Sequence, residues 1–281
     1  MAINAADVKR LREKTGAGMM DCKKALVKAD GDFDRAETIL KEMGLAAVAK
    51  RADRSADEGR VFTYVSPRIA GIMELSCETD FVARNEQFAE TGTGMIKDAV
   101  ESNKNADDAG LQAKATELAT TIKENIQLRR LEKMEADATE KIFDYIHGEA
   151  GSVGVLVKLR ADKAALLSDE QVLTLGKDLT LHAAAFNPPY LNESKVESSY
   201  LAEQERIFQA QAANMDKPAQ VIQGIVKGKL NKHLKEICFT EQGFVKDEKR
   251  SVAQVLKDLS KELGGTIELV DYRVYRAGEA L

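Results

Sequence analysis

The chain has 281 residues, of which 44% are hydrophobic and 31% charged, and its formal net charge is −5. This length suffices for two or three domains with real cores, and the acidic balance argues against direct binding of nucleic acid, since proteins that bind nucleic acid are more often strongly basic. No stretch approaches the roughly 20 apolar residues of a membrane span, and the N-terminus has no apolar segment of signal-peptide length, so we expect a cytoplasmic protein without membrane contact.

The N-terminal stretch that ends at Gly44 is expected to form three short helices. Asn4, with Asp7 three residues later, is a capping pair for the first of them, and Gly44 stands where a glycine commonly ends a helix. The stretch looks like a three-helix module of the ubiquitin-associated type. Residues 45–54 are charged and rich in alanine, and we expect them to be a tether. Together they give a first domain of residues 1–54.

Beyond this tether the apolar residues alternate with polar ones, a pattern that predicts strands. Residues 61–65 and 69–75 are expected to pair as a hairpin around Ser66-Pro67-Arg68. Residues 142–146 repeat the first of these strands almost residue for residue, and residues 153–157 repeat the second strand.

Helical sequence follows both hairpins, over residues 80–100 and 168–186. We therefore expect an α+β fold with two repeated subdomains, residues 55–140 and 141–281.

The second subdomain carries an insertion at about residues 192–237. Two helical stripes are interrupted by Asn214-Met215-Asp216-Lys217-Pro218, which predicts an antiparallel helical hairpin. Asn192, Gln204 and Gln211 make its seam polar in places. A helix over residues 251–263 and a last strand from Thr266 to Tyr275 are expected to complete the fold.

The run Cys77-Glu78-Thr79-Asp80-Phe81-Val82-Ala83-Arg84-Asn85 follows the strand at residues 69–75. Thr79 or Asp80 can cap a helix there, because a short side-chain oxygen can accept a free N–H of the first turn. Phe81 would then stand at the tip of a strand-to-helix corner. The local pattern alone favours a capped helix with this phenylalanine in the core, and an exposed apolar tip is the alternative.

Two further runs carry information beyond their local structure: Thr15-Gly16-Ala17-Gly18-Met19-Met20-Asp21-Cys22-Lys23-Lys24-Ala25-Leu26 and Asn125-Ile126-Gln127-Leu128-Arg129-Arg130. With the run at Cys77, they closely resemble the signatures of the elongation factor Ts family, the nucleotide-exchange factors of the GTPase elongation factor Tu. The resemblance covers most of the chain. Ser76 departs from it, because the family usually has asparagine at that position.

The resemblance implies a non-enzymatic guanine-nucleotide exchange factor whose partner is elongation factor Tu. Asp80 and Phe81, flanked by Thr79 and Val82, are expected to intrude near the magnesium and nucleotide site of the GTPase. Phe81 would act as a wedge, while Asp80 would cap its own helix or pair with groups of the partner.

The resemblance also implies two docking surfaces. Arg12, Met19 and Met20 are expected to dock on the GTPase domain, and one of the two methionines is expected to be a core residue instead. His147, at a hairpin tip, and Ile126 are expected to contact a second domain of the partner.

The family has a coiled hairpin where the insertion lies, so a homodimer or a 2:2 complex through it is possible. Longer members continue into a C-terminal helix, whereas this sequence ends at Leu281. This difference predicts a weaker affinity or another division of contacts, with exchange retained.

Catalytic motifs are not evident in the sequence. The turn Gly16-Ala17-Gly18 lacks the GxxxxGK[ST] pattern of a phosphate loop, and the three cysteines, Cys22, Cys77 and Cys238, have no metal-ligand spacing. His182 and His233 fall on helical stripes and are expected to be packing residues. We therefore expect no enzymatic activity, no cofactor and no bound metal.

A second interpretation is an adaptor protein that binds a partner through its N-terminal helices and uses the α+β part as a scaffold. It predicts that Asp80 and Phe81 are buried locally and contribute to stability alone. A third class, nucleic-acid binding, is disfavoured by the net charge, and a salt-sensitive shift of RNA would revive it.

Overall fold

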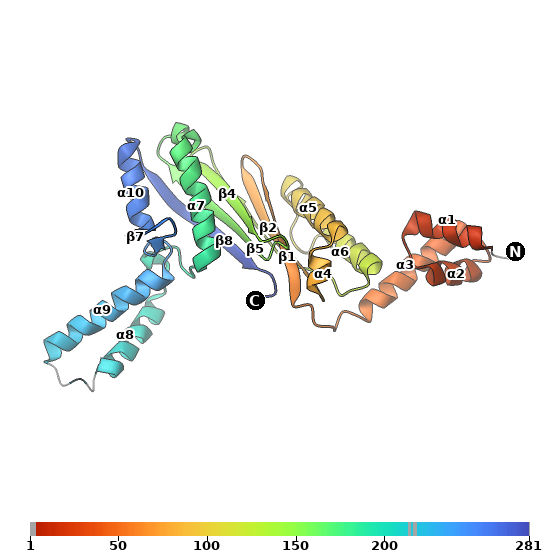
Figure 1. Ribbon diagram of the computed structural model, residues 1–281, viewed down its shortest axis with the longest axis horizontal. Coiled ribbons are helices and arrows are strands. Elements are labelled where there is room, and N and C mark those ends of the chain that lie inside the picture. Colours follow the sequence, from red (N-terminus) through yellow and green to blue (C-terminus); the bar gives the residue numbers. More distant parts are fainter. Residues whose placement is uncertain (1–3, 213–214, 216–217, 281) are drawn as a thin grey trace.

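The computed structural model describes residues 4–212, 215 and 218–280. The chain is elongated, with three N-terminal helices at one end, two sheets in the middle and a projecting pair of helices at the other end (Figure 1). This arrangement confirms the expected α+β class with three helices at the N-terminus. The expected duplication of two subdomains stays a prediction.

The N-terminal helices are α1 (Ala5–Thr15), α2 (Met19–Lys28) and α3 (Phe33–Ala49). The capping pair of α1 is confirmed, since Asp7 N–H donates to Asn4 Oδ1 at 2.8 Å and Asn4 N–H donates to the Asp7 carboxylate at 3.5 Å. Leu11, Cys22 and Leu26 are fully buried in the small core of these helices.

The expected helix end at Gly44 is wrong, because α3 continues through Gly44 to Ala49. A Cβ atom on residue 44 would lie 2.5 Å from Cγ2 of Thr120 in α6 (Ala109–Ile122). The glycine therefore serves close packing between two helices and does not stop a helix. The tether expected over residues 45–54 is correspondingly shorter, since its first half is helical.

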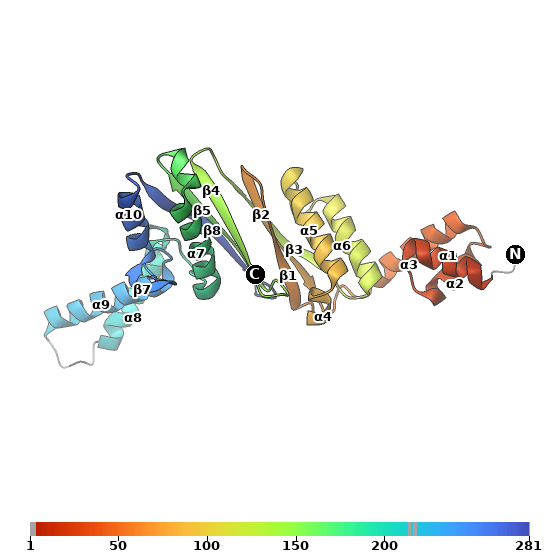
Figure 2. The same cartoon turned by 45° about the horizontal axis from the view of Figure 1, so that its top comes forward.

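The first sheet contains β1 (Glu58–Val65), β2 (Ile69–Cys77) and β3 (Gln127–Glu135), all antiparallel and in that order. The predicted hairpin of β1 and β2 is confirmed, whereas β3 and α6 are not among the predicted elements. The helices α4 (Asp80–Ala83), α5 (Glu86–Glu101) and α6 follow β2. Helices α5 and α6 cover one face of this sheet (Figure 2), where Phe88, Met95 and Ile96 are fully buried.

The second sheet contains β4 (Glu140–His147), β5 (Val153–Ala161) and β8 (Ile267–Arg276), again antiparallel and in that order. Its outer face is covered by α7 (Glu170–Phe186) and α10 (Val252–Glu262), and its inner face packs against the first sheet. Short 3-10 turns, η1 (Ala164–Ser168) and η2 (Glu193–Lys195), and a small pair of strands, β6 (Gly243–Phe244) and β7 (Asp247–Ser251), complete this part.

Both faces of β2 are therefore buried, which explains its almost continuous apolar run. Ala70 and Ile72 face the second sheet, while Met73 and Leu75 face α5 and α6. Val61, Leu156 and Tyr275 join the layer between the two sheets. This layer makes the two sheets one packed body.

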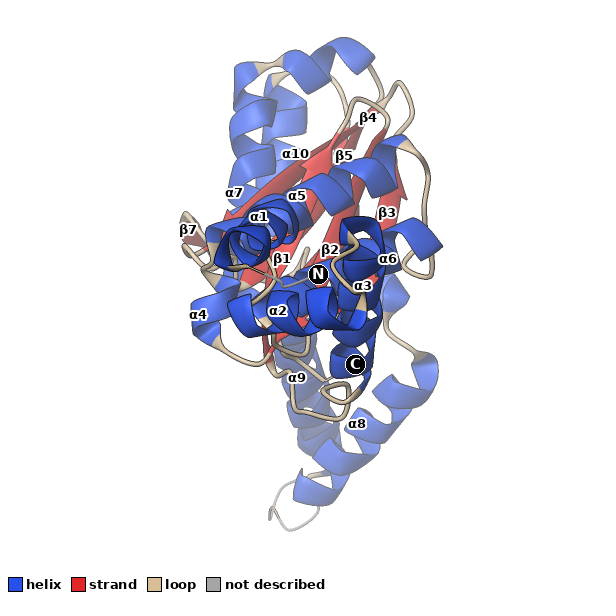
Figure 3. Ribbon diagram, turned by 90° about the vertical axis from the view of Figure 1, so that its right-hand side faces the viewer, coloured by secondary structure: helices blue, strands red, loops and turns tan. Residues whose placement is uncertain are grey.

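The insertion forms α8 (Ser198–Ala212) and α9 (Ala219–Ile237), which pack together as a hairpin that projects away from the sheets (Figure 3). The expected break between them falls largely outside the described residues, which include only Met215 and Pro218 of that segment. His233 is a packing residue as expected, because its Nε2 lies 2.8 Å from the Tyr200 hydroxyl. Among the helices in the described part of the chain, none has the length and apolarity to cross a membrane.

Candidate functional site

The end of β2 leads directly into α4 through a sharp corner, Thr79–Val82. Thr79 is the N-cap of α4, and its Oγ1 accepts the N–H of Val82 at 3.4 Å. Of the two capping residues left open by the sequence, the structure thus selects Thr79. Asp80 is the first helical residue, so the expectation that Asp80 could cap its own helix is wrong, and Phe81 is the second.

The side chain of Phe81 is 82% exposed, the largest exposed fraction among the large hydrophobic side chains that the structure describes. The helix has only four residues, and its inward-facing one is Ala83, which is 1% exposed. Val82 packs partly against the core of the first sheet. A helix anchored on Val82 and Ala83 turns Phe81 outward, so the expected core phenylalanine is wrong and the exposed apolar tip is confirmed.

Asp80 lies beside this tip with about half of its side chain exposed. Its Oδ2 lies 3.5 Å from Nη2 of Arg84, one helical turn later. An exposed pair of this kind contributes about 0.3–0.5 kcal/mol, so the carboxylate can exchange Arg84 for another cation at little cost.

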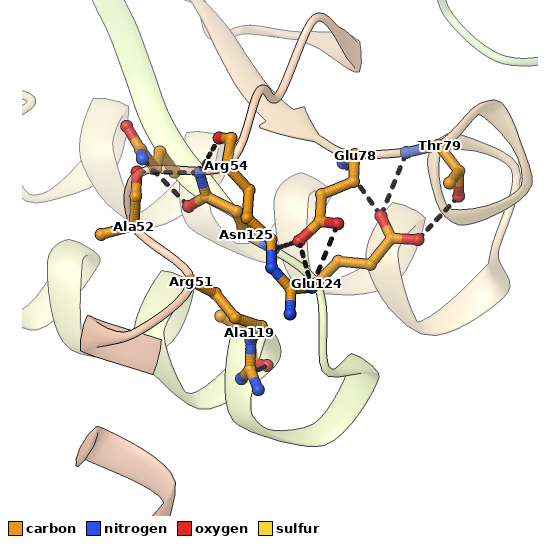
Figure 4. A network of polar contacts seen from close by, with 9 residues as sticks. Arg51, Ala52, Arg54, Glu78, Thr79, Ala119, Glu124 and Asn125 are labelled. Atoms are coloured by element: carbon orange, nitrogen blue, oxygen red, sulfur yellow. Dashed lines mark hydrogen bonds and ion pairs between the residues drawn. The ribbon is translucent and has the colours of Figure 1, made fainter. Parts of the chain in front are cut away.

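The corner is held from below by Glu124, on the short connection between α6 and β3 (Figure 4). Glu124 Oε2 accepts the backbone N–H groups of Glu78 at 2.9 Å and of Thr79 at 3.1 Å, while Oε1 accepts the Thr79 hydroxyl at 2.7 Å. Because the only hydroxyl hydrogen of Thr79 is committed to Glu124, a lone pair of Oγ1 is left for Val82 N–H. Glu124 is not among the predicted site residues, although it directly precedes the run that starts at Asn125.

The thiol of Cys77 lies under the corner and donates to the Thr79 carbonyl oxygen at 3.2 Å. Burial raises the pKa of this thiol to about 12, since the thiolate would lose its hydration. Cys77 is therefore a packing group at neutral pH, without the thiolate character that a nucleophile needs.

A hollow of about 390 Å³ separates the corner from the turn between β4 and β5. Asp80 and Arg84 line it from the corner, and Gly148, Glu149 and Ser152 line it from the turn. The structure thus brings the corner close to the hairpin tip that carries His147. The His147 ring is exposed, and its Nδ1 lies 2.9 Å from the Tyr145 hydroxyl.

Ile126, expected at the same contact as His147, is only 4% exposed and packs in the core of the first sheet. A side chain in this position cannot offer a surface to a partner, and its burial does not fit the expected contact. Its physical role is to anchor the start of β3.

Met19 and Met20 begin α2 and are 50% and 61% exposed. The expectation that one of them is a core residue is therefore wrong, because Cys22, Ala25 and Leu26 fill the inward face of α2. Arg12, near the end of α1, is also exposed. The helices that carry these three residues lie away from α4, at the far end of α3 (Figure 1).

Clusters of three or more His, Cys, Asp or Glu side chains that could hold a metal ion do not occur among the described residues. The corner, the hairpin tip and the two methionines offer an exposed phenyl ring, a carboxylate and flexible thioethers. These groups suit binding to another protein.

Comparison with known proteins places these features in one family. A family model described as "Elongation factor TS" matches residues 78–279. Elongation factor Ts of Borrelia hermsii is 44% identical over 278 residues, which cover 99% of this chain and 100% of that protein. Elongation factor Ts of Treponema denticola is 45% identical over 278 residues, which cover 99% of each chain. Elongation factor Ts of Borreliella burgdorferi (strain ZS7) is 45% identical over 276 residues, covering 98% of this chain and 99% of that protein.

Proposed function

The chain belongs to the elongation factor Ts family, the nucleotide exchange factors of elongation factor Tu, and from this premise we propose that its Thr79–Val82 corner enters the GTPase beside the bound nucleotide. The exposure of Phe81 on a firmly anchored corner is the single observation that carries this proposal. Phe81 is the wedge in the partner, near the magnesium ion that holds GDP. Displacing the groups around that ion loosens the β-phosphate and releases GDP, so that GTP can bind.

The energy available from Phe81 is of the right size for this task. Fully burying one phenylalanine contributes about 1.5–3 kcal/mol, and each 1.4 kcal/mol changes an equilibrium about tenfold. Coupling between two ligands is reciprocal, so the factor by which this protein weakens GDP binding equals the factor by which GDP weakens the complex. Phe81 supplies one to two powers of ten, and further contacts supply the rest.

Asp80 is the nearest further contact. Its carboxylate is half-exposed and pairs with Arg84 at the surface. In the complex, Asp80 pairs with hydrogen-bond donors or cations of the GTPase near the magnesium site.

Arg12, Met19 and Met20 form the docking surface of the N-terminal helices on the GTPase domain. Exposed methionines suit an adaptable apolar contact, because the thioether chain is flexible and polarisable. His147 contacts a second domain of elongation factor Tu. The hollow between Asp80 and the turn that follows His147 supports this proposal, because it leaves the corner and the hairpin tip open to the same partner. Ile126 is left out of this surface because it is buried.

The same proposal assigns roles to the parts of the chain. Residues 1–54 are the docking module, residues 55–140 the subdomain that carries the corner, and residues 141–281 the second subdomain. The projecting hairpin of α8 and α9 is the surface for self-association, as a homodimer or a 2:2 complex. The protein works in the cytoplasm, where translation takes place.

Release of a fluorescent GDP from elongation factor Tu tests the proposal directly. We expect strong acceleration by the wild-type protein and a decrease of about 10- to 150-fold for Phe81→Ala, from the lost burial of one phenyl ring. Val221→Ala removes another exposed apolar side chain, 45% exposed on α9, and should leave the rate unchanged. Equal rates for wild type and a folded Phe81→Ala variant would reject the wedge.

The adaptor interpretation differs at this point. It predicted that Asp80 and Phe81 are buried, whereas Phe81 is 82% exposed. Its remaining prediction is that removing the Phe81 side chain costs stability and not function. Thermal unfolding of the same variant, run beside the GDP release, separates the two interpretations.

A further inference from the structure

Two adjacent residues on the connection between α6 and β3 hold two parts of the chain that are distant in sequence. Glu124 holds the corner through three hydrogen bonds to Glu78 and Thr79. Asn125 holds the segment that follows α3, because its side-chain Nδ2 donates to the carbonyl oxygens of Ala52 at 3.2 Å and Arg54 at 2.7 Å. Figure 4 shows both sets of bonds meeting at this connection.

Every N–H group of Asn125 is used as a hydrogen-bond donor. Both hydrogens of its amide bind carbonyl oxygens, its Oδ1 accepts from Gln127 Nε2 at 3.0 Å, and its backbone N–H donates to Glu78 Oε1 at 2.7 Å. The residue is only 4% exposed, so leaving any of these groups without a partner is costly. The side-chain amide has two N–H hydrogens, which suits it to bind two neighbouring carbonyl groups without burying a charge.

The segment and the corner are also joined directly. Nη1 of Arg54 lies 3.3 Å from Glu78 Oε1, the same carboxylate oxygen that accepts the Asn125 N–H. One turn earlier, Arg51 Nη2 donates to the carbonyl oxygen of Ala119 in α6 at 3.0 Å. Residues 51–54 are therefore pinned to the core at several points and do not behave as a free tether.

We propose that Glu124 and Asn125 form a brace that fixes the corner relative to the N-terminal helices, so that Phe81 and the Met19–Met20 surface meet the GTPase at a set spacing. This inference rests on the proposed function, since it needs both surfaces to contact the same partner. Both residues of the brace are positioning residues, because Asn125 is buried and the Glu124 carboxylate is bound to Glu78 and Thr79 of the same chain.

The two residues act on different steps of exchange. Asn125 presents two contact surfaces as one rigid unit, and such preorganisation lowers the cost of binding. Glu124 fixes the corner itself, on which the displacement of the nucleotide depends. Loss of the Asn125 contacts should therefore raise the half-saturating concentration, while loss of the Glu124 contacts should lower the maximal rate.

The variants follow from this chemistry. Asn125→Asp keeps the shape but places a carboxylate against the carbonyl oxygens of Ala52 and Arg54, so the segment should detach. Glu124→Gln keeps one acceptor oxygen and turns an amide NH₂ group toward N–H donors. Arg54→Gln, at an exposed position, removes only the contact between the Arg54 side chain and Glu78. It should therefore loosen the segment less than Asn125→Asp and leave folding intact.

Two matched controls remove a charge elsewhere. Glu117→Gln lies on the exposed side of α6, and Arg68→Gln lies in the exposed turn between β1 and β2. Both should leave exchange and interspin distances unchanged.

The distance between two spin labels tests the brace in the absence of the GTPase. With Lys9→Cys on α1 and Glu90→Cys on α5, both exposed, the native cysteines Cys22, Cys77 and Cys238 stay buried and unlabelled. We expect a narrow distribution of interspin distances in the otherwise wild-type protein and a broad one with Asn125→Asp, with Arg54→Gln in between.

The effect of the brace on exchange is tested by GDP release from elongation factor Tu, measured over a range of exchange-factor concentrations. We expect Asn125→Asp to raise the half-saturating concentration about tenfold and keep the maximal rate, in the manner of a lost linkage between two sites. Glu124→Gln should lower the maximal rate and keep the half-saturating concentration. A purely structural role would lower the active fraction in proportion to stability and would not split the two parameters.

The outcomes separate the brace from the wedge. A narrow distance distribution in folded Asn125→Asp would overturn the brace, whatever happens to exchange. A broad distribution with an unchanged half-saturating concentration would overturn its role in exchange. A Phe81→Ala variant as active as wild type would reject the proposed function, while the distance measurement would still decide whether the brace exists.

Discussion

Nε of Arg130 lies 2.6 Å from Oε2 of Glu74, whose side chain is fully buried between the two sheets. Arg129 Nη1 reaches the other oxygen of the same carboxylate at 3.0 Å. Successive side chains of a regular strand point to opposite faces, so both could not normally meet one acceptor. A bulge makes this possible, because the register shifts between Glu74 and Leu75 and β3 contributes one extra residue there.

Arg130 makes more contacts around the buried Glu74 carboxylate than Arg129 does, and this difference gives a first prediction. Arg130 also donates to the Arg276 carbonyl oxygen at 3.0 Å and stacks 3.8 Å from the centre of the Tyr275 ring. Arg130→Met leaves a buried carboxylate with fewer partners and should cost about 3 kcal/mol of unfolding free energy. Arg129→Met, the matched control on the neighbouring position, should cost clearly less. Urea denaturation measures both, and equal losses would show that the additional contacts of Arg130 do not matter.

A second prediction concerns the close packing of α3 on α6. An alanine in a helix interior is normally more stable than glycine by about 1 kcal/mol. At Gly44 the added Cβ would lie 2.5 Å from Thr120 Cγ2, so Gly44→Ala should instead destabilise the protein by about 1–3 kcal/mol. Thr120→Ser removes that methyl group and keeps the hydroxyl. In a protein that carries Thr120→Ser, Gly44→Ala should become neutral or stabilising. If the two substitutions instead change the unfolding free energy additively, the close contact between residues 44 and 120 is not the cause.

Local chemistry explains which parts of the structure were predictable. The capping pair of Asn4 and Asp7 acts over three residues, and the alternation of β1 and β2 reflects a hairpin with a short turn, so both could be predicted. Gly44 was misassigned because its neighbour Thr120 is 76 residues away along the chain, and nothing near Gly44 distinguishes a packing glycine from a capping one.

The candidate site likewise contains residues that the local sequence predicts and residues that depend on distant contacts. Thr79, Asp80 and Phe81 stand in one run with a recognisable pattern, whereas Glu124 reaches Thr79 across 45 residues. No local periodicity encodes that contact. β3 was missed for a similar reason, because its bulge and its many charged residues disturb the alternation that marks a strand. Burial on both sides of a strand also hides which residue of β2 faces which layer.

A third prediction concerns pH. His182 is fully buried and stacked on the Phe239 ring, with Nε2 2.9 Å from Gln242 Oε1 and Nδ1 3.2 Å from the Val245 N. Because the Val245 N–H donates to Nδ1, the ring is neutral and donates its Nε2–H to Gln242. Burial lowers the pKa of His182 below its ordinary value of 6.5.

The sign of the effect follows from this shift. The unfolded chain takes up a proton on His182 below pH 6.5, while the folded protein resists it until the pH reaches the lowered value. The stability that His182 contributes is therefore complete above pH 6.5 and is lost as the pH falls toward the folded pKa, by up to about 1.4 kcal/mol per pH unit.

Denaturation at pH 7.5 and pH 5.5 would measure this loss. His182→Gln should be less stable than wild type at pH 7.5 and should show a flatter decrease toward pH 5.5. His147→Gln, at the exposed hairpin tip, is the control and should keep the wild-type slope. A wild-type slope in His182→Gln would mean that other groups cause the acid sensitivity.

The last prediction separates docking from displacement. Met20 is 61% exposed on α2, far along the chain from the corner, so its contact with the GTPase should form in the bound state before and after GDP leaves. An interaction made equally in both states lowers the half-saturating concentration without changing the maximal rate. Met20→Ala should therefore raise the half-saturating concentration about tenfold, from the loss of about 1.4 kcal/mol of apolar burial, and keep the maximal rate of GDP release.

Phe81→Ala should lower the maximal rate of GDP release and keep the half-saturating concentration, because the wedge acts on the step that displaces the nucleotide. In the double variant the two effects should be independent, with each parameter changed as in the corresponding single variant. Titration of GDP release against exchange-factor concentration gives both parameters in one experiment, with Val221→Ala as the control for loss of an exposed apolar side chain. A lower maximal rate in Met20→Ala would show that the N-terminal helices take part in displacing the nucleotide as well as in docking, because a contact that only docks cannot alter the rate once the partner is saturated.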